Sequence, residues 1–256
     1  MFSPHGGTVG CRRSDAPRFS LVIPAHNEAA FLPRLLDSVE AARSVTTAGA
    51  IEVVVADNGS TDATAAIAEQ RGCIVAKVEK RVIAAARNGG AATAHGEILC
   101  FTDADGRIHP QTFNAIGAAA DAGRAVAGAT GLTMERWSAG LIATYVLMLP
   151  LVWLTKMDSG VVWCRRADFL VVGGYDEDRR VAEDVAFLLA LRRHGRRDGR
   201  KLERVHGAKV IGSVRKFDEH GDWHYFTQMP RVALRMLARP AARDEFVERY
   251  WYRTKR

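Results

Sequence analysis

The sequence is poor in cysteine and carries no cysteine framework. Its four cysteines, Cys11, Cys73, Cys100 and Cys164, lie far apart and form no Cys-x-x-Cys pair. This spacing excludes a disulfide-stapled scaffold, gives no support for a zinc site and favours a reducing, cytoplasmic location. The first residues also lack the apolar run of a secretory signal, so we expect residues 1–17 to form a flexible tail.

Internal repeats and low-complexity linkers are absent as well. The 256 residues are 48% hydrophobic and 25% charged, which excludes a collagen-like or disordered chain. A chain of this length buries enough apolar surface to fold without a metal or a disulfide. We therefore expect one compact unit, or two closely associated halves.

Acidic residues are scarce in the last quarter of the chain. Residues 192–256 contain 18 Lys and Arg against 8 Asp and Glu, whereas residues 1–191 contain 18 against 21. Such an excess of positive charge suits nucleic acid, a phosphorylated substrate or an acidic membrane surface, and it also occurs on plain solvated surfaces. The basic residues lack the interleaved aromatic side chains that stack on bases, which disfavours nucleic acid.

Strand and helix patterns alternate along the first half of the chain. Short apolar runs predict strands at 19–24, 51–56, 73–78, 98–102 and 125–129. Helical patterns fall between or after them, around 32–39, 85–95, 111–122, 168–173 and 183–194, with Ser60 or Thr61 as the expected cap of one further helix. This alternation predicts an α/β fold with a mostly parallel sheet flanked by helices, whose ligands bind beyond the carboxyl ends of the strands.

One stretch, residues 137–155, contains no charged residue. Its length just reaches that of a membrane span, but Pro150 interrupts it and no second apolar segment follows. A single crossing would separate the acidic residues before it from those after it, so we do not expect a span. A buried core helix, a dimer contact and a helix at a membrane interface remain as alternatives.

Acidic residues recur where the predicted strands end. Glu28 follows the first strand, Asp57 the second, and Asp103 and Asp105 the fourth, while Glu183 and Asp184 begin a helix. Each pair alone is compatible with a simple turn or a favourable charge at a helix start. Gathered at one sheet edge, however, several carboxylates repel one another unless a cation lies among them, and oxygen ligands suit Mg²⁺ or Mn²⁺ completed by phosphate oxygens.

Six short motifs follow one another along the chain: Val22–Glu28, Asp57–Asp62, Ala86–Gly89, Asp103–Asp105, Gly173–Glu177 and Glu183–Asp184. In these motifs and in their order, the sequence over about residues 19–220 resembles the family-2 inverting glycosyltransferases of the GT-A fold. The resemblance implies a nucleotide-sugar-binding half at residues 18–109 and an acceptor-binding and catalytic half at 110–221. A basic C-terminal helical extension is expected at 222–256, on the acceptor side.

The resemblance also implies a role for each matching residue. Asp184 would be the catalytic base with Glu183 beside it, and Asp105, together with Asp103, would hold Mn²⁺ or Mg²⁺. The nucleotide-sugar, UDP- or GDP-linked, would be bound by Pro24, Ala25, Asn27, Glu28, Asp57, Arg87, Asp103 and Ala104. Arg215 and Lys216 would cover the diphosphate, because paired cations bind phosphates well. An inverting displacement needs no enzyme nucleophile, and the sequence shows no compelling one.

One departure from the family pattern and two alternatives bear on the function. Gln228–Val232 replaces the Gln-x-x-Arg-Trp motif of processive relatives, which predicts a small, non-processive enzyme. A sugar nucleotidyltransferase is disfavoured because Pro24–Glu28 stands where such enzymes carry a Gly-rich loop, and a non-catalytic anion- or membrane-binding module is the other alternative. The acceptor is unknown, with a lipid-linked or cell-envelope glycan as one option, which would place the protein peripherally at the inner face of the membrane. His206 and His220 are considered as a third metal ligand, but neither is assigned.

Overall fold

A seven-stranded sheet forms the centre of the molecule. The computed structural model describes residues 16–155, 157–158, 160–179 and 182–227. The strands are β1 (Phe19–Ala25), β2 (Ile51–Asp57), β3 (Ile74–Lys77), β4 (Ile98–Phe101), β5 (Ala125–Met134), β6 (Val162–Arg165) and β7 (Lys201–Gly212), in the spatial order β3-β2-β1-β4-β6-β5-β7. Only β6 runs antiparallel to its neighbours β4 and β5. The predicted α/β fold with a mostly parallel sheet is confirmed.

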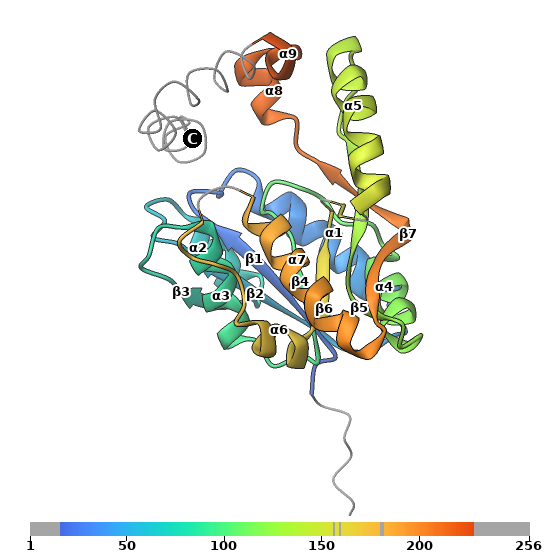
Figure 1. The fold of residues 1–256 in the computed structure, drawn as a ribbon. Helices are drawn as coiled ribbons and strands as arrows, with labels where there is room; N and C mark the ends of the chain where they lie inside the picture. Colours follow the sequence, from blue (N-terminus) through green and yellow to red (C-terminus); the bar gives the residue numbers. More distant parts are fainter. Residues whose placement is uncertain (1–15, 156, 159, 180–181, 228–256) are drawn as a thin grey trace, which may run out of the picture.

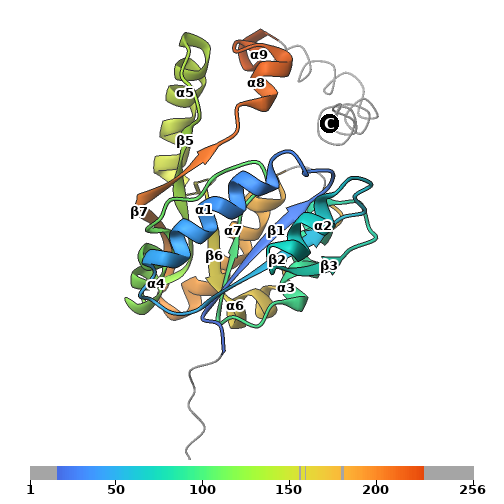
Figure 2. The ribbon, with the colours of Figure 1, turned by 180° about the vertical axis from the view of Figure 1, so that it is seen from behind.

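Helices cover both faces of this sheet (Figures 1 and 2). The helices are α1 (Leu32–Val45), α2 (Thr64–Gln70), α3 (Ile83–Thr93), α4 (Thr112–Asp121), α5 (Ala139–Thr155), α6 (Arg166–Val172), α7 (Glu183–Gly195), α8 (Arg215–His220) and α9 (His224–Thr227). Side chains of α1, α2 and α4 pack in one hydrophobic cluster, and those of α3, α6 and α7 pack in another on the opposite face. Every residue of β1 is buried, as expected for a central strand covered on both sides.

The sheet extends beyond the strands that the sequence predicts. β5 continues to Met134, five residues past the predicted end at Ala129, because it pairs along its length with β7. β6 and β7 themselves were not predicted. The expected cap of α2 was wrong: Ala63 precedes the helix, and the carboxylate of Asp62 accepts the Thr64 amide hydrogen at 2.9 Å.

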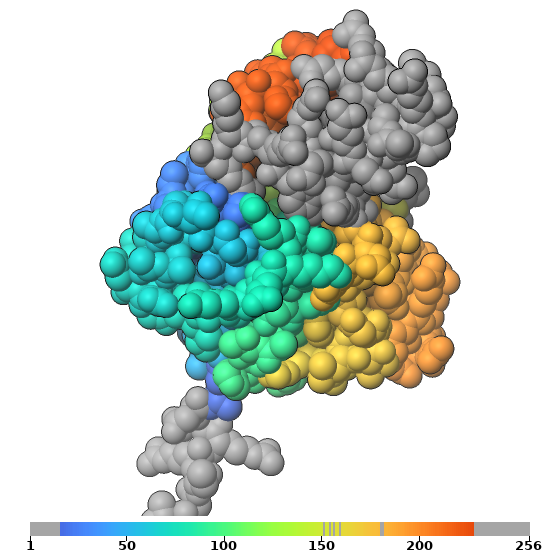
Figure 3. Space-filling model, turned by 90° about the vertical axis from the view of Figure 1, so that its left-hand side faces the viewer, coloured from blue at the N-terminus to red at the C-terminus, as the bar shows by residue number. Residues whose placement is uncertain are grey.

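Three helices form a projecting unit, which we define as α5, α8 and α9. They extend from one end of the sheet body, opposite α6, in both ribbon views (Figures 1 and 2), and the space-filling view shows α8 and α9 at the upper end of the molecule (Figure 3). The guanidinium of Arg136 pairs with Asp218 at 2.5 Å and with Asp222 at 2.7 Å, which ties the start of α5 to the other two helices. Leu141 of α5 packs on Val214 and Phe217.

α5 is not the core helix that was one of the expectations for residues 137–155. Pro150 lies inside a continuous helix, and most of the large apolar side chains described after Leu141 are exposed to solvent. None of the described helices is both long and apolar enough to cross a membrane. The projecting position therefore leaves the dimer and membrane-interface alternatives for this segment.

Candidate active site

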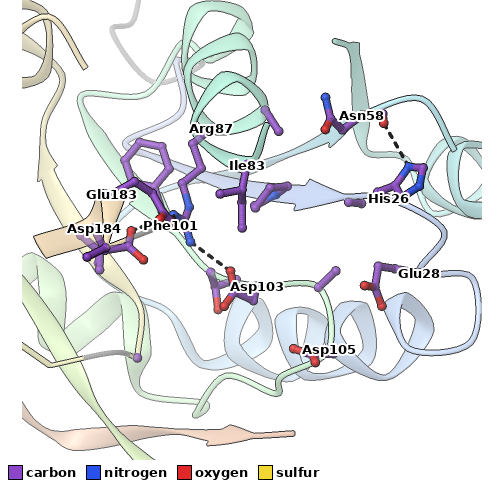
Figure 4. Close-up of a pocket in the computed structure, with 18 of the residues that line it drawn as sticks. His26, Glu28, Asn58, Ile83, Arg87, Phe101, Asp103, Asp105, Glu183 and Asp184 are labelled. Atoms are coloured by element: carbon purple, nitrogen blue, oxygen red, sulfur yellow. Dashed lines mark hydrogen bonds and ion pairs between the residues drawn. The ribbon is translucent and has the colours of Figure 1, made fainter. Parts of the chain in front are cut away.

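A cavity of about 550 Å³ lies at the carboxyl edge of the sheet (Figure 4). Several chain segments line it, among them the loops after β1, β2 and β4, helix α3, and the starts of α7 and α8. Of the residues predicted for the site, Pro24, Ala25, Glu28, Arg87, Asp103, Ala104, Asp105, Glu183, Asp184, Arg215 and Lys216 line this cavity. Residues up to 192 positions apart in the chain, from Pro24 to Lys216, therefore meet at the edge where parallel strands end, as the fold requires.

Asn27 and Asp57 shape the cavity from outside its lining. Asn27 has a positive φ of 54°, and its side-chain oxygen accepts the Thr61 amide hydrogen at 2.8 Å. Asp57 is buried at the end of β2, where its carboxylate accepts the Ser60 amide hydrogen at 3.0 Å. Asn27 thus fastens the loop after β1 to the loop after β2, and Asp57 holds the loop after β2 against the end of its own strand.

Two lining residues, His26 and Asn58, were missed as site residues. The backbone oxygen of Asn58 lies 3.0 Å from Nδ1 of His26, and the Asn58 amide donates to the carbonyl oxygens of Val78 and Lys80 at 3.1 and 2.7 Å. Asn58 therefore links the loop after β2 to the segment before α3. Its place in the Asp57–Asp62 motif, directly after a strand end, was the sequence signal for it.

Asp103 and Asp105 differ in their surroundings although one residue separates them. The side chain of Asp103 is 63% exposed, whereas that of Asp105 is 24% exposed. Burial raises the pKa of Asp105, and the neighbouring Asp103 carboxylate raises it further, while Arg215 and Lys216 act against this rise. An additional positive charge beside Asp105 would therefore be favourable.

The start of α8 supplies two cations to this acidic pair. Arg215 bridges two segments, with Nη1 3.2 Å from Oε2 of Glu28 and Nη2 3.3 Å from Oδ2 of Asp105. Its guanidinium also lies over the Phe31 ring, 4.8 Å from the centroid. Burial lowers the pKa of Lys216 to about 8, against the attraction of Asp103 and Asp105. The projecting unit thus contributes directly to the cavity.

At the opposite end of the cavity, Arg87 of α3 forms ion pairs with three acidic residues. It is buried, and its Nη1 lies 2.9 Å from Glu183 and 2.8 Å from Asp184, while its Nη2 lies 3.1 Å from Asp103. The guanidinium stacks over the Tyr175 ring at 5.2 Å. Arg87 therefore fixes the acidic residues of two segments relative to one another, as the close-up shows (Figure 4).

Asp184 has the protonation behaviour expected of a general base. Burial among the cavity walls raises its pKa to about 6, and the negative charges of Glu183 and Asp103 add to the rise, while Arg87 opposes it. A carboxylate with this pKa is largely ionised at neutral pH and more basic than an ordinary aspartate. It can therefore take a proton from a hydroxyl group bound in the cavity.

The donor set fits a divalent cation that relies on its ligand for most of its coordination. Among the described residues, no group of three or more His, Cys, Asp or Glu side chains is arranged to hold a metal ion. Asp103 and Asp105 nevertheless offer hard oxygen donors at a cavity wall, and the raised pKa of Asp105 marks a place where positive charge is favourable. Mg²⁺ and Mn²⁺ commonly bind through one or two carboxylates plus substrate phosphates. Neither His206 nor His220 is among the described residues that line the cavity.

The fold is that of the GT-A glycosyltransferases, and comparisons with known proteins agree. The family model described as glycosyl transferase family 2 matches residues 20–137. This segment belongs to that family, and the predicted family membership is confirmed.

Curated relatives share the same part of the chain. Validoxylamine A glucosyltransferase of Streptomyces hygroscopicus subsp. jinggangensis is 39% identical over 112 residues, which cover 41% of this chain and 26% of the relative. Glycosyltransferase AglE of Haloferax volcanii is 36% identical over 104 residues, covering 38% of this chain and 34% of the relative. The matched region thus spans about a quarter to a third of these relatives' length.

Solved structures show the same fold at low sequence identity. S. aureus TarS 1–349 superposes with a TM-score of 0.62 at 20% identity, covering 80% of this chain and 63% of that one. Mannosyltransferase PcManGT from Pyrobaculum calidifontis, in complex with GDP-Man and Mn²⁺, gives 0.60 at 23% identity, covering 78% and 57%. Glucosyl-3-phosphoglycerate synthase from Mycobacterium tuberculosis, with Mn²⁺ and UDP, gives 0.55 at 19% identity, covering 80% and 76%.

Proposed function

We propose that this protein transfers a sugar from a UDP- or GDP-linked donor to an acceptor hydroxyl, with inversion at the anomeric carbon. One observation carries the proposal: the acidic pair of the loop after β4 and the acidic pair of α7 face a single cavity, with Arg87 between them. This arrangement supports a leaving-group end and a base end on either side of one sugar. Complexes of the similar folds with UDP, UDP-GlcNAc and GDP-Man support a donor of this class.

The base end performs the proton transfer. Asp184 takes the proton of the acceptor hydroxyl as the hydroxyl oxygen forms a bond to the anomeric carbon. The bond from that carbon to the diphosphate oxygen breaks at the same time, and its electron pair leaves with the nucleoside diphosphate. Attack and departure on opposite faces invert the anomeric configuration. Arg87 holds Asp184 and Glu183 in place through its two short ion pairs.

The leaving-group end stabilises the negative charge of the diphosphate. Asp103 and Asp105 would hold Mn²⁺ or Mg²⁺, which when bound neutralises charge on the departing diphosphate. Arg215 and Lys216, which now face Asp105, are close enough to the same wall to contact phosphate oxygens. The loop after β1, with Pro24, Ala25 and Glu28, would receive the nucleoside, supported by Asn27 and Asp57 behind it.

The two ends of the cavity assign donor binding and acceptor binding to different parts of the chain. Residues 18–109 would bind the donor and residues 110–221 the acceptor, as one domain. Most of the expected tail, residues 1–15, and most of the basic extension, residues 228–256, lie outside the described residues. We further propose that transfer is non-processive and takes place in the cytoplasm, with a lipid-linked or cell-envelope glycan as one acceptor class.

Metal-dependent donor binding tests the leaving-group end. Calorimetric titration of UDP and GDP with and without Mn²⁺ should show tighter binding of one nucleotide with the metal. Asp105→Asn should abolish this gain, whereas Asp121→Asn, a change of the same kind on the exposed end of α4, should keep it. Unchanged Mn²⁺-dependent affinity in Asp105→Asn would contradict the assignment.

The released products test the reaction class. With a panel of UDP- and GDP-sugars and Mn²⁺, slow transfer to water should release the nucleoside diphosphate and an inverted free sugar. Pyrophosphate formation from a nucleoside triphosphate and a sugar phosphate would instead establish a nucleotidyltransferase. Binding of anions without turnover of any donor would favour the non-catalytic module.

A further inference from the structure

The described residues of the projecting helix α5 that are exposed to solvent are all apolar. Ile142, Val146, Leu149 and Trp153 recur at the helical spacing of four, three and four residues and form one exposed stripe. Leu147 and Met148 are also exposed, at 56% and 41%, and they point to other sides of the helix. Trp153, near the far end, is 75% exposed. A water-soluble surface helix would carry polar residues on these sides.

The neighbouring helix α9 extends the same apolar surface. Trp223 and Phe226 are exposed at 50% and 39%, and their rings pack together with centroids 5.7 Å apart. Arg136 connects α5 with Asp218 and Asp222 on either side of the turn that leads into α9. Because these contacts hold the helices together, α9 and α5 lie at the same end of the molecule (Figures 1 and 2).

The sequence that follows α9 is strongly basic. Residues 228–256 contain eight Lys and Arg against three Asp and Glu, and an arginine stands at every fourth position from Arg231 to Arg243. An apolar surface continued by such a segment matches the two parts of a lipid interface, the acyl boundary and the anionic headgroups. Tryptophan side chains are also favoured at this boundary.

We propose that α5 and α9 form a docking face for an anionic lipid bilayer. A partner helix or a second copy of the chain would cover the stripe of Ile142 and Trp153 and leave Leu147 and Met148 in water. A bilayer surface surrounds an embedded helix and accepts all of these side chains at once. The basic sequence that follows α9 adds positive charge, which anionic headgroups attract. Since the proposal concerns binding only, it stands or fails independently of the transfer reaction.

Vesicle co-sedimentation of the full chain tests this face with a matched pair of variants. Vesicles of phosphatidylcholine with one-third phosphatidylglycerol are compared with pure phosphatidylcholine, at low and at physiological salt. Val146→Glu with Leu147→Glu places two charges on α5. Leu170→Glu with Val171→Glu places two charges on α6, where both residues are 67% exposed at the opposite end of the molecule. All four positions are exposed, so both double variants should melt at the wild-type temperature.

We expect the wild type and the α6 variant to sediment with anionic vesicles, more weakly as salt rises. The α5 variant should bind at least tenfold more weakly. Wild-type protein that stays in the supernatant, or equal binding by the two variants, would overturn the proposal. The proposal would also be overturned if the wild type were a dimer that does not bind vesicles and the α5 variant were a monomer. That result would assign the face to a second copy of the chain. If the α5 variant does not fold, the tryptophan fluorescence of the wild type is measured with vesicles of brominated lipid. Only tryptophans embedded in the bilayer are quenched, so an absence of quenching would overturn the proposal.

Discussion

Two helices of similar length, α1 and α5, meet their surroundings in opposite ways. α1 buries Leu32, Leu35, Leu36, Val39 and Ala42 against the sheet, and its charged residues, such as Asp37 and Glu40, lie on the other side. α5 carries no charge, leaves the sheet body and exposes most of its large described side chains. In α1, apolar residues on one side and charged residues on the other correctly indicate a helix that packs on the core. In α5, apolar residues on all sides indicate only that the surroundings are apolar, and not that the helix lies in the core.

Truncating a leucine in each helix should give the largest contrast. Leu35→Ala opens a cavity under α1 and should lower the free energy of unfolding by about 2–5 kcal/mol. Leu147→Ala, on exposed α5, should change it by less than about 0.5 kcal/mol. Urea unfolding followed by circular dichroism measures both. Equal losses would mean that α5 is packed after all.

The chemistry should depend on the sheet body and not on exposed acids of α1. Asp184→Asn removes the base and should reduce transfer about 10²-fold or more while donor affinity stays nearly normal. Asp37→Asn, on the exposed side of α1, should retain full activity. Initial rates and nucleotide titrations separate the two effects. If Glu183→Gln were inactive and Asp184→Asn active, the roles of the two acids would be exchanged.

Arg215 tests the junction between the sheet body and the projecting unit. Arg215→Ala removes a charged contact at the diphosphate end and should weaken UDP or GDP binding about tenfold in the presence of Mn²⁺. Arg197→Ala, an exposed arginine after α7, serves as the control and should leave affinity unchanged. A wild-type affinity in Arg215→Ala would show that α8 takes no part in donor binding.

The smallest expected effect is the pH dependence of the reaction. The base must be ionised, and its pKa is raised to about 6, so kcat/KM should rise as the pH increases through 6. The gain between pH 6 and 7 should be about twofold, since half of the carboxylate is already ionised at pH 6. The α5 double variant should show the same profile, because that helix lies away from Asp184. A midpoint near 4 would contradict the raised pKa.

Local patterns predicted the strands of the first half and the acidic residues that follow them. β6, which is no shorter than the predicted β3 and β4, and β7 both escaped prediction. In β7, charged residues such as Glu203 and Lys209 interrupt the apolar run. The ion pairs of Arg87 with Glu183 and Asp184 were also beyond sequence reasoning, which assigned Arg87 to the nucleotide by resemblance. Ninety-six positions separate Arg87 from Glu183, and no local period connects them. The same holds for Arg215 and Glu28, which meet only because α8 folds back over the cavity.

The antiparallel pairing of β5 with β6 has a consequence for engineering. Ala127 pairs with Cys164 and Ala129 with Val162, so the chain leaves the sheet after β5 and returns beside it at β6. In topological terms the segment carrying α5 is the long connection of a β-hairpin. Its two ends are neighbours in the sheet, so this arm can be shortened or exchanged while the register of the strands is retained. If the arm were transplanted, it would bring its exposed apolar surface to the new protein. If it were shortened, β5 and β6 would still pair as a hairpin in the α/β body.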